Sequence, residues 1–237
     1  GKHAIVEKPV AGSLVEADQL IAAEARSHGS LFPVFQYRYG KAFDQLAALR
    51  AAGLPGRPVA ATIETHWSRD KQYYANLWRG SWNHELGGAV LIHAIHAHDL
   101  LTQHFGAVAD VAAVLTTNAN PVETEDCAAI SLRMANGSLA TSSITLGAAT
   151  DTTRLRFVYE HLTAESGTAP YAPGIGEWRF TARNRDKQAK IDAILQDVPD
   201  GLSGFAGYFD AIADAIEGRP GREVTLAAGL ASIELAS

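Results

Sequence analysis

Cysteine is nearly absent from the sequence, with Cys127 alone among 237 residues. A single cysteine excludes an intrachain disulfide framework and a zinc cage built of several thiolates. It fits a reducing compartment, so we expect a cytoplasmic protein. The sequence also lacks a run of about 18 uninterrupted apolar residues, and we therefore expect no transmembrane helix. The N-terminal residues have the pattern of a buried strand and not that of a signal peptide.

Positive charge is scarce as well, because 20 Lys and Arg residues face 26 Asp and Glu residues, for a formal net charge of -6. Binding to nucleic acid requires a basic face that neutralises phosphates, so this balance argues against a nucleic-acid partner. What is present suits a globular protein: 47% hydrophobic and 19% charged residues provide for a real core. The length allows one large domain or one and a half ordinary ones.

The first forty residues predict a strand, a helix and a second strand. Residues 3–7 form a short apolar run that ends in a charged turn. Ser13 and Glu16 have the spacing of a capping box, and helical spacing of apolar residues continues from there until Gly29. Residues 31–36 are again apolar and predict a buried strand. Strand, helix and strand in this order indicate one parallel crossover unit.

The rest of the chain predicts strands joined by hairpins, with helices collected elsewhere. Asn136-Gly137 is a strong hairpin signal. We expect strands at 58–67, 107–117, 127–134, 138–146, 153–160 and 176–182, helices at 42–52, 88–104, 203–217 and from 225 onward, and loops at 68–85 and 161–176. This pattern predicts an α+β fold, in which a large, mostly antiparallel sheet carries helices on one face.

In one predicted strand, apolar side chains alternate with a mixed set, and this pattern bears on how copies of the chain associate. Apolar Ala128, Ile130 and Leu132 alternate with the mixed set Ala129, Ser131 and Arg133. One face of the sheet is then moderately polar and lacks a cover of helices, as at an interface. We therefore expect a homodimer or homotetramer that associates through the sheet.

The first candidate site is Glu7-Lys8-Pro9, directly after a predicted parallel strand. Open α/β sheets bind their ligands at the carboxyl ends of the strands. A lysine there can lie close to a cofactor or substrate, with its pKa set by burial and nearby charges, and a cis Lys-Pro bond is one way to fix its direction. The alternative is a solvated turn without function.

The second candidate is a predicted helix rich in histidine. His93, His96 and Asp99 are spaced three residues apart and so share a helix face. A histidine held beside a hydroxyl exchanges protons near neutral pH. One alternative is that these histidines form structural hydrogen bonds. Another is a metal site, for which His66 and His84 are further donors.

The third candidate is the loop that carries Tyr73, Tyr74, Trp78, Arg79 and Trp82. Aromatic and arginine side chains gather on a loop when they line an interface or stack on a ring or sugar. A structural aromatic cluster beneath a long loop is the alternative.

Together these features resemble the GFO/IDH/MocA family, the relatives of glucose–fructose oxidoreductase and inositol dehydrogenase. The similarity runs over essentially the whole chain and keeps the order of the family's motifs. The matching segments are residues 1–9, Gln36-Tyr37-Arg38-Tyr39, Trp78-Arg79-Gly80 with Trp82, Gly87-Gly88, residues 95–99, Glu123-Thr124-Glu125-Asp126 and the hairpin at Asn136-Gly137.

The resemblance implies a division into two domains. Residues 1–40 would be the C-terminal remnant of a dinucleotide-binding Rossmann domain, and residues 41–237 the substrate-binding and oligomerisation domain. No G-x-G-x-x-G followed by a helix occurs in the sequence. We therefore expect the chain to lack most of its Rossmann domain, and to hold a dinucleotide poorly and be inactive in this form.

The resemblance further implies an NAD- or NADP-dependent enzyme that transfers a hydride to or from a secondary alcohol of a sugar or polyol. Lys8 matches the family's catalytic lysine, and His96 matches its acid–base histidine. Four residues before that histidine the polyol dehydrogenases have an aspartate, whereas Ile92 stands here, and His93 could serve instead. Implied cofactor contacts are Glu7, Lys8, Pro9, Trp78 and Arg79, and candidate substrate contacts are Arg38, Tyr74 and Asp99.

Two other functions stay open at this point. One is a non-catalytic family relative used for assembly or sugar sensing, which the change to Ile92 would suit. The other is a metal-dependent hydrolase or lyase that uses the histidine-rich helix.

Overall fold

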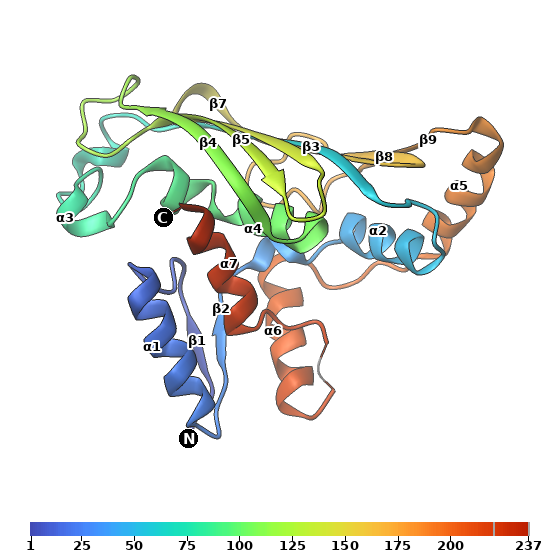
Figure 1. Cartoon of the computed structure of the whole chain (residues 1–237), viewed down its shortest axis with the longest axis horizontal. Coiled ribbons are helices and arrows are strands. Elements are labelled where there is room, and N and C mark those ends of the chain that lie inside the picture. Colours follow the sequence, from blue (N-terminus) through green and yellow to red (C-terminus); the bar gives the residue numbers. More distant parts are fainter. Residues whose placement is uncertain (220, 237) are drawn as a thin grey trace.

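The computed structural model of the chain describes residues 1–219 and 221–236. A small strand–helix–strand unit lies to one side of a broad sheet, and helices fill the space between them (Figure 1). Among the described residues, no helix is long and apolar enough to cross a membrane.

The small unit consists of β1 (Ala4–Val6), α1 (Leu14–Ala25) and β2 (Leu31–Pro33), and its two strands pair in parallel as predicted. Ser13 caps α1 by accepting the Glu16 N–H at 3.2 Å. The Glu16 carboxylate accepts from the Gly12 N–H at 2.8 Å. In a capping box it would accept from the N–H of the N-cap residue, Ser13, instead. The expected end of the helix at Gly29 was wrong, because α1 ends four residues earlier. Gly29 instead passes the first strand so closely that a Cβ there would lie 2.0 Å from the Lys2 carbonyl oxygen.

The broad sheet has the strand order β4-β5-β6-β3-β7-β8-β9. Every neighbouring pair is antiparallel except β3 with β6, which is parallel. The predicted α+β fold is confirmed. The strands are β3 (Pro58–Ser68), β4 (Val108–Thr116), β5 (Cys127–Met134), β6 (Leu139–Thr145), β7 (Gly147–Tyr159), β8 (Leu162–Glu165) and β9 (Arg179–Ala182).

The hairpin between β5 and β6 turns at Asn136-Gly137, as predicted. Gly137 has a φ of +85°, and the Asn136 side chain accepts from the Ser138 N–H at 2.9 Å. In β5 the alternation also holds, since Ala128, Ile130 and Leu132 are buried while their neighbours are exposed.

Three elements escaped prediction because their apolar signals are short or weak, and the first is the single-turn helix α3 (Trp82–Glu85) inside the expected 68–85 loop. The strand β8 lies inside the expected 161–176 loop and contributes only Leu162 and Ala164 to the core. The helix α5 (Gln188–Asp197) buries Ile191 alone. A four-residue alternation and a helix with one core residue fall below what periodicity resolves.

Helices cover one face of the sheet and connect it to the small unit (Figure 1). The helix α2 (Lys41–Ala51) packs its Leu46 and Leu49 into the core, and α4 (Ile95–Phe105) adds Leu100 and Leu101. The helix α6 (Gly204–Ile216) packs its Tyr208 beside β2, and α7 (Leu226–Ala236) contacts both α4 and α1.

The predicted helix at 88–104 is two segments and not one. A π-helical turn, Ala89–His93, precedes α4, and its Ala94 N–H bonds to the Ala89 carbonyl at 2.9 Å. Glu125 holds the start of this turn: one carboxylate oxygen accepts from the N–H groups of Gly88 and Val90, both at 3.1 Å. A Cβ at Gly88 would lie 2.0 Å from the Glu125 carbonyl oxygen, so glycine is needed there.

Candidate active site

A cavity of about 690 Å³ opens where the carboxyl ends of β1 and β2 meet the π-helical turn and the 69–86 loop. Its volume lies in the range of small-molecule sites. Three sequence-predicted groups reach it together: Glu7-Lys8-Pro9, His93 with His96, and Trp78 with Arg79. The structure therefore gathers segments that lie up to about ninety residues apart in the sequence.

Lys8 follows β1, and its bond to Pro9 is cis. Its Nζ donates to the main-chain carbonyl oxygen of Ile92 at 2.6 Å. Burial lowers the pKa of Lys8, and Arg79 adds to this effect while Glu7 and Glu85 oppose it. A carbonyl of the π-helical turn thus anchors the lysine at the position where the family resemblance implies an aspartate.

His96 lies at the start of α4 and is buried. Its ring stacks on Tyr37, with centroids 4.4 Å apart, and meets the edge of Phe35 at 5.6 Å. Burial, with a smaller effect of Lys8, lowers the pKa of His96 to about 3, so the ring is neutral at physiological pH. Its Nδ1 is buried without a partner among the described residues, which leaves Nε2 as the nitrogen that can meet a ligand.

His93, Tyr73 and Arg79 form a hydrogen-bonded chain along the cavity wall. The His93 Nε2 lies 2.9 Å from the Tyr73 hydroxyl, and Arg79 donates to the same oxygen. Burial and the cations Arg69, Lys8 and Arg79 lower the pKa of His93 to about 3. The Arg79 guanidinium also lies over the Tyr73 ring, 4.0 Å from its centroid.

Glu85, which sequence analysis did not identify, contacts Arg79 and the backbone of the loop that carries it. It is buried, lies 3.6 Å from Arg79 and accepts the Gly80 N–H. Gly80 has a φ of +68°, and its carbonyl accepts from the Glu123 N–H at 2.8 Å. The signal in the sequence was a carboxylate six residues after Arg79, which is close enough along the chain to pair with it.

Other cavity residues that prediction missed are aromatic or polar. Gln36 and Tyr37 follow β2, at the carboxyl end of the second parallel strand, where their position was a usable signal. The Oε1 of Gln36 is buried without a partner among the described residues. Arg69 pairs with Asp151 at 3.1 Å and lies 5.0 Å above the Trp67 ring, which packs on Tyr171.

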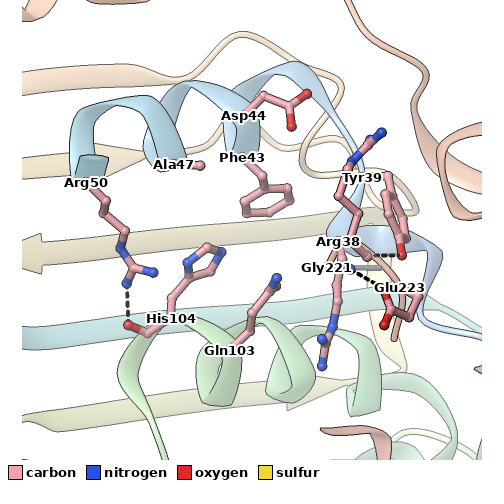
Figure 2. Close-up of a pocket in the computed structure, with 11 residues that line it drawn as sticks. Arg38, Tyr39, Phe43, Asp44, Ala47, Arg50, Gln103, His104, Gly221 and Glu223 are labelled. Atoms are coloured by element: carbon pink, nitrogen blue, oxygen red, sulfur yellow. Dashed lines mark hydrogen bonds between the residues drawn. The ribbon is translucent and has the colours of Figure 1, made fainter. Parts of the chain in front are cut away.

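The three predicted substrate contacts lie elsewhere. Arg38 donates two hydrogen bonds to Asp99, at 2.7 and 2.5 Å, and Asp99 is fully buried. Arg38 borders a different cavity of about 300 Å³ beside α2, together with Phe43 and His104 (Figure 2). In the aromatic loop Tyr73, and not its neighbour Tyr74, lines the larger cavity.

The donors considered for a metal site are dispersed. Asp99 is bonded to Arg38, and the His66 Nε2 lies 2.9 Å from the Ser143 hydroxyl. His84 borders the larger cavity, and its Nδ1 lies 3.4 Å from the Ser81 hydroxyl. Within residues 1–219 and 221–236, no three His, Cys, Asp or Glu side chains are grouped so that they could hold a metal ion.

Comparison with known sequences gives one family and one curated relative. The GFO/IDH/MocA C-terminal domain matches residues 43–165. An uncharacterized oxidoreductase of Synechocystis sp. is 28% identical over 156 residues, which make up 57% of this chain. The chain spans 40% of the length of that relative.

Solved structures of similar fold include two dehydrogenases bound to ligands. The WlbA dehydrogenase from Bordetella pertussis, in complex with NADH and UDP-GlcNAcA, is 26% identical with a TM-score of 0.80, over 99% of this chain and 68% of that one. The WlbA enzyme of Chromobacterium violaceum, with the same ligands, is 25% identical with a TM-score of 0.79, over 99% and 66%. The aldose–aldose oxidoreductase of Caulobacter crescentus, at 17% identity and a TM-score of 0.77 over 99% and 68%, shares the fold.

Proposed function

Since the chain belongs to the GFO/IDH/MocA family, we propose that its protein is a nicotinamide-dependent oxidoreductase acting on a secondary alcohol of a sugar or polyol. One observation carries the proposal: Lys8 and His96, from separate elements, line one cavity of about 690 Å³. A lysine and a neutral imidazole that line one cavity are groups that can bind an alcohol and exchange its proton.

The substrate proposed first is a sugar nucleotide. The two WlbA dehydrogenases were crystallised with UDP-GlcNAcA, and they match nearly the whole of this chain. In this chain the cavity presents aromatic faces from Trp67, Trp78 and Tyr171, and polar groups from Lys8 and Gln36. Aromatic faces with a few directed polar groups suit a hydroxylated ring.

Glu7, Lys8, Pro9, Trp78 and Arg79 would hold the nicotinamide end of NAD or NADP. These residues fit such a group, because the Trp78 side chain is 44% exposed and borders the cavity. Arg79 lies 4.2 Å from the Trp78 ring centroid and so fixes that ring at the cavity edge. When bound, the cofactor supplies the hydride chemistry, and the protein supplies orientation and proton transfer.

His96 would exchange the hydroxyl proton of the alcohol through Nε2, because its Nδ1 is buried away from the ligand. The ring is neutral at physiological pH because its pKa is about 3. One Lys8 hydrogen is bonded to the Ile92 carbonyl, which leaves two others to donate to the substrate oxygen. His93 lines the same cavity and is the second candidate for proton exchange.

The test uses the complete natural protein. Titration with NADH and NADPH, followed by cofactor fluorescence, should show saturable binding of at least one of the two. Oxidation of UDP-GlcNAcA is then measured with the preferred cofactor, followed by a screen of sugars and polyols. Binding of neither cofactor would support the non-catalytic alternative and overturn the proposal.

A further inference from the structure

The Tyr73 hydroxyl lies between Arg79 and His93 on the cavity wall. Arg79 donates to the hydroxyl oxygen, and the His93 Nε2 lies 2.9 Å from it. A phenol has one hydrogen to donate and two lone pairs that accept. Arg79 fills one lone pair. Tyr73 therefore either donates its hydrogen to His93 or accepts one from it.

The other ring nitrogen of His93 decides between these arrangements. Nδ1 is buried and has no partner among the described residues. If Tyr73 donated to Nε2, the hydrogen of the neutral ring would sit on Nδ1 as a buried N–H without an acceptor. Orphaned buried N–H groups are rarer than buried acceptors with an unused lone pair. The ring hydrogen is therefore on Nε2, and His93 donates to Tyr73.

Arg69 is the weaker of the two cations beside the Tyr73 hydroxyl: against the rise that burial causes, its charge lowers the pKa of Tyr73 less than that of Arg79 does, and its hydrogen bonds of 3.3 Å or less go to other oxygens. Its guanidinium lies 4.9 Å from the Tyr73 ring centroid. However, its Nη1 donates to Ser68 and Asp151, and its Nη2 donates to Tyr171 at 3.3 Å. Arg79 and His93 thus occupy both lone pairs of the Tyr73 oxygen. The phenol hydrogen has no acceptor left among these neighbours and is free to point into the cavity.

We propose that Tyr73 is a substrate-binding residue that donates its hydroxyl hydrogen to an oxygen of the sugar in this cavity. His93 and Arg79 are then positioning residues that aim the hydroxyl. This inference rests on the proposed function for the identity of the ligand. It gives His93 a task other than proton exchange, and it moves the aromatic substrate contact from Tyr74 to Tyr73.

The hydrogen arrangement is tested without any activity. In the complete protein labelled with ¹⁵N-histidine, two-bond ¹H–¹⁵N spectra distinguish the two neutral tautomers, and His93→Gln assigns the signals of His93. We expect the Nε2–H form at neutral pH. An Nδ1–H form at His93 would overturn the inference, whatever the enzyme does.

The contact with substrate is tested by removing the hydroxyl. Tyr73→Phe should lower kcat/KM for UDP-GlcNAcA about 3- to 10-fold, as expected for the loss of one hydrogen bond. Tyr159→Phe makes the same chemical change at a hydroxyl that lies 3.2 Å from Arg50, outside this cavity, and should leave kcat/KM unchanged. Equal values for the two variants, or an equal loss in Tyr74→Phe, would refute the contact.

The positioning role has its own readout. A glutamine side chain keeps an N–H donor, so His93→Gln should retain more activity than His93→Leu. Equal losses in the two variants would count against it. If the wild-type protein turns over no sugar with either cofactor, the proposed function fails, while the histidine spectra still decide how Tyr73 is oriented.

Discussion

Glu125 supports the geometry of the cavity from outside it, since it does not line the cavity itself. It is buried, and its carboxylate accepts from the N–H groups of Gly88 and Val90. These two bonds fix the start of the π-helical turn that presents the Ile92 carbonyl to Lys8. Loss of the carboxylate should therefore destabilise the fold and displace the lysine's anchor.

The magnitude follows from the two hydrogen bonds. A bond to a charged acceptor contributes about 1.5–3 kcal/mol, so Glu125→Ala should lower the free energy of unfolding by about 3–6 kcal/mol. Glu125→Gln keeps one neutral acceptor oxygen and should cost about 1–3 kcal/mol. The matched control is Glu123→Ala, since Glu123 is exposed and its carboxylate lies 3.3 Å from the Trp82 nitrogen. That change should stay within about 0.5 kcal/mol.

Urea denaturation followed by circular dichroism and by tryptophan fluorescence measures all three variants, provided that the two signals coincide. The order of stability should be wild type and Glu123→Ala first, then Glu125→Gln, then Glu125→Ala. A loss below about 1 kcal/mol in Glu125→Ala would refute the reasoning, because two buried N–H groups would then have lost their acceptor with little effect.

Three further predictions concern the histidines and the sheet. His96→Ala should lower turnover by about two to four orders of magnitude while cofactor affinity stays unchanged, and an active variant would refute its role as base. Burial lowers the pKa values of His93, His96 and His104 to about 3 and that of His98 to about 4. Because the unfolded chain binds these protons first, stability should fall as the pH drops below about 6.5, by about 2 kcal/mol per histidine at pH 5; equal denaturation midpoints at pH 7 and pH 5 would contradict this. Val114 of β4 is 73% exposed, so Val114→Glu should convert a dimer or tetramer into a monomer in light scattering, and a monomeric wild type at micromolar concentration would contradict association through the sheet.

Sequence patterns predicted β3, β5 and β6 well because these strands are long and bury every second residue. The alternation of buried and exposed residues in β5 gives the two-residue period of a strand, and Asn136-Gly137 gives the turn of the hairpin. The histidine-rich helix was predicted as continuous because residues 89–95 are apolar except for His93 and so show no period that would separate a π-helical turn from an α-helix. What breaks it is Glu125, a residue more than thirty positions away. A local pattern does not contain that contact.

In the candidate site, too, local sequence patterns were informative and long-range contacts were not predicted. Lys8 and His96 were found because their motifs lie at a strand end and on a helix. Arg38 and Asp99 were predicted as substrate contacts because they lie in motifs of the family, but the two charges are both largely buried and pair with each other. A buried charge without a partner is strongly unfavourable, and that requirement takes both side chains away from the cavity.

Ile92 stands where the family resemblance implies an aspartate, and its main-chain carbonyl is the acceptor that Lys8 has there. A carboxylate beside Lys8 would favour the ammonium form with a full negative charge. The Ile92 carbonyl offers only a dipole, at 2.6 Å, and burial then lowers the pKa of Lys8. His96 is neutral, with a pKa that burial and the nearby Lys8 lower to about 3. Among the described residues neither group forms an ion pair, so the backbone of the π-helical turn holds Lys8 and the ring of Tyr37 holds His96. The proposed catalytic arrangement therefore depends on how rigidly Glu125 fixes the turn.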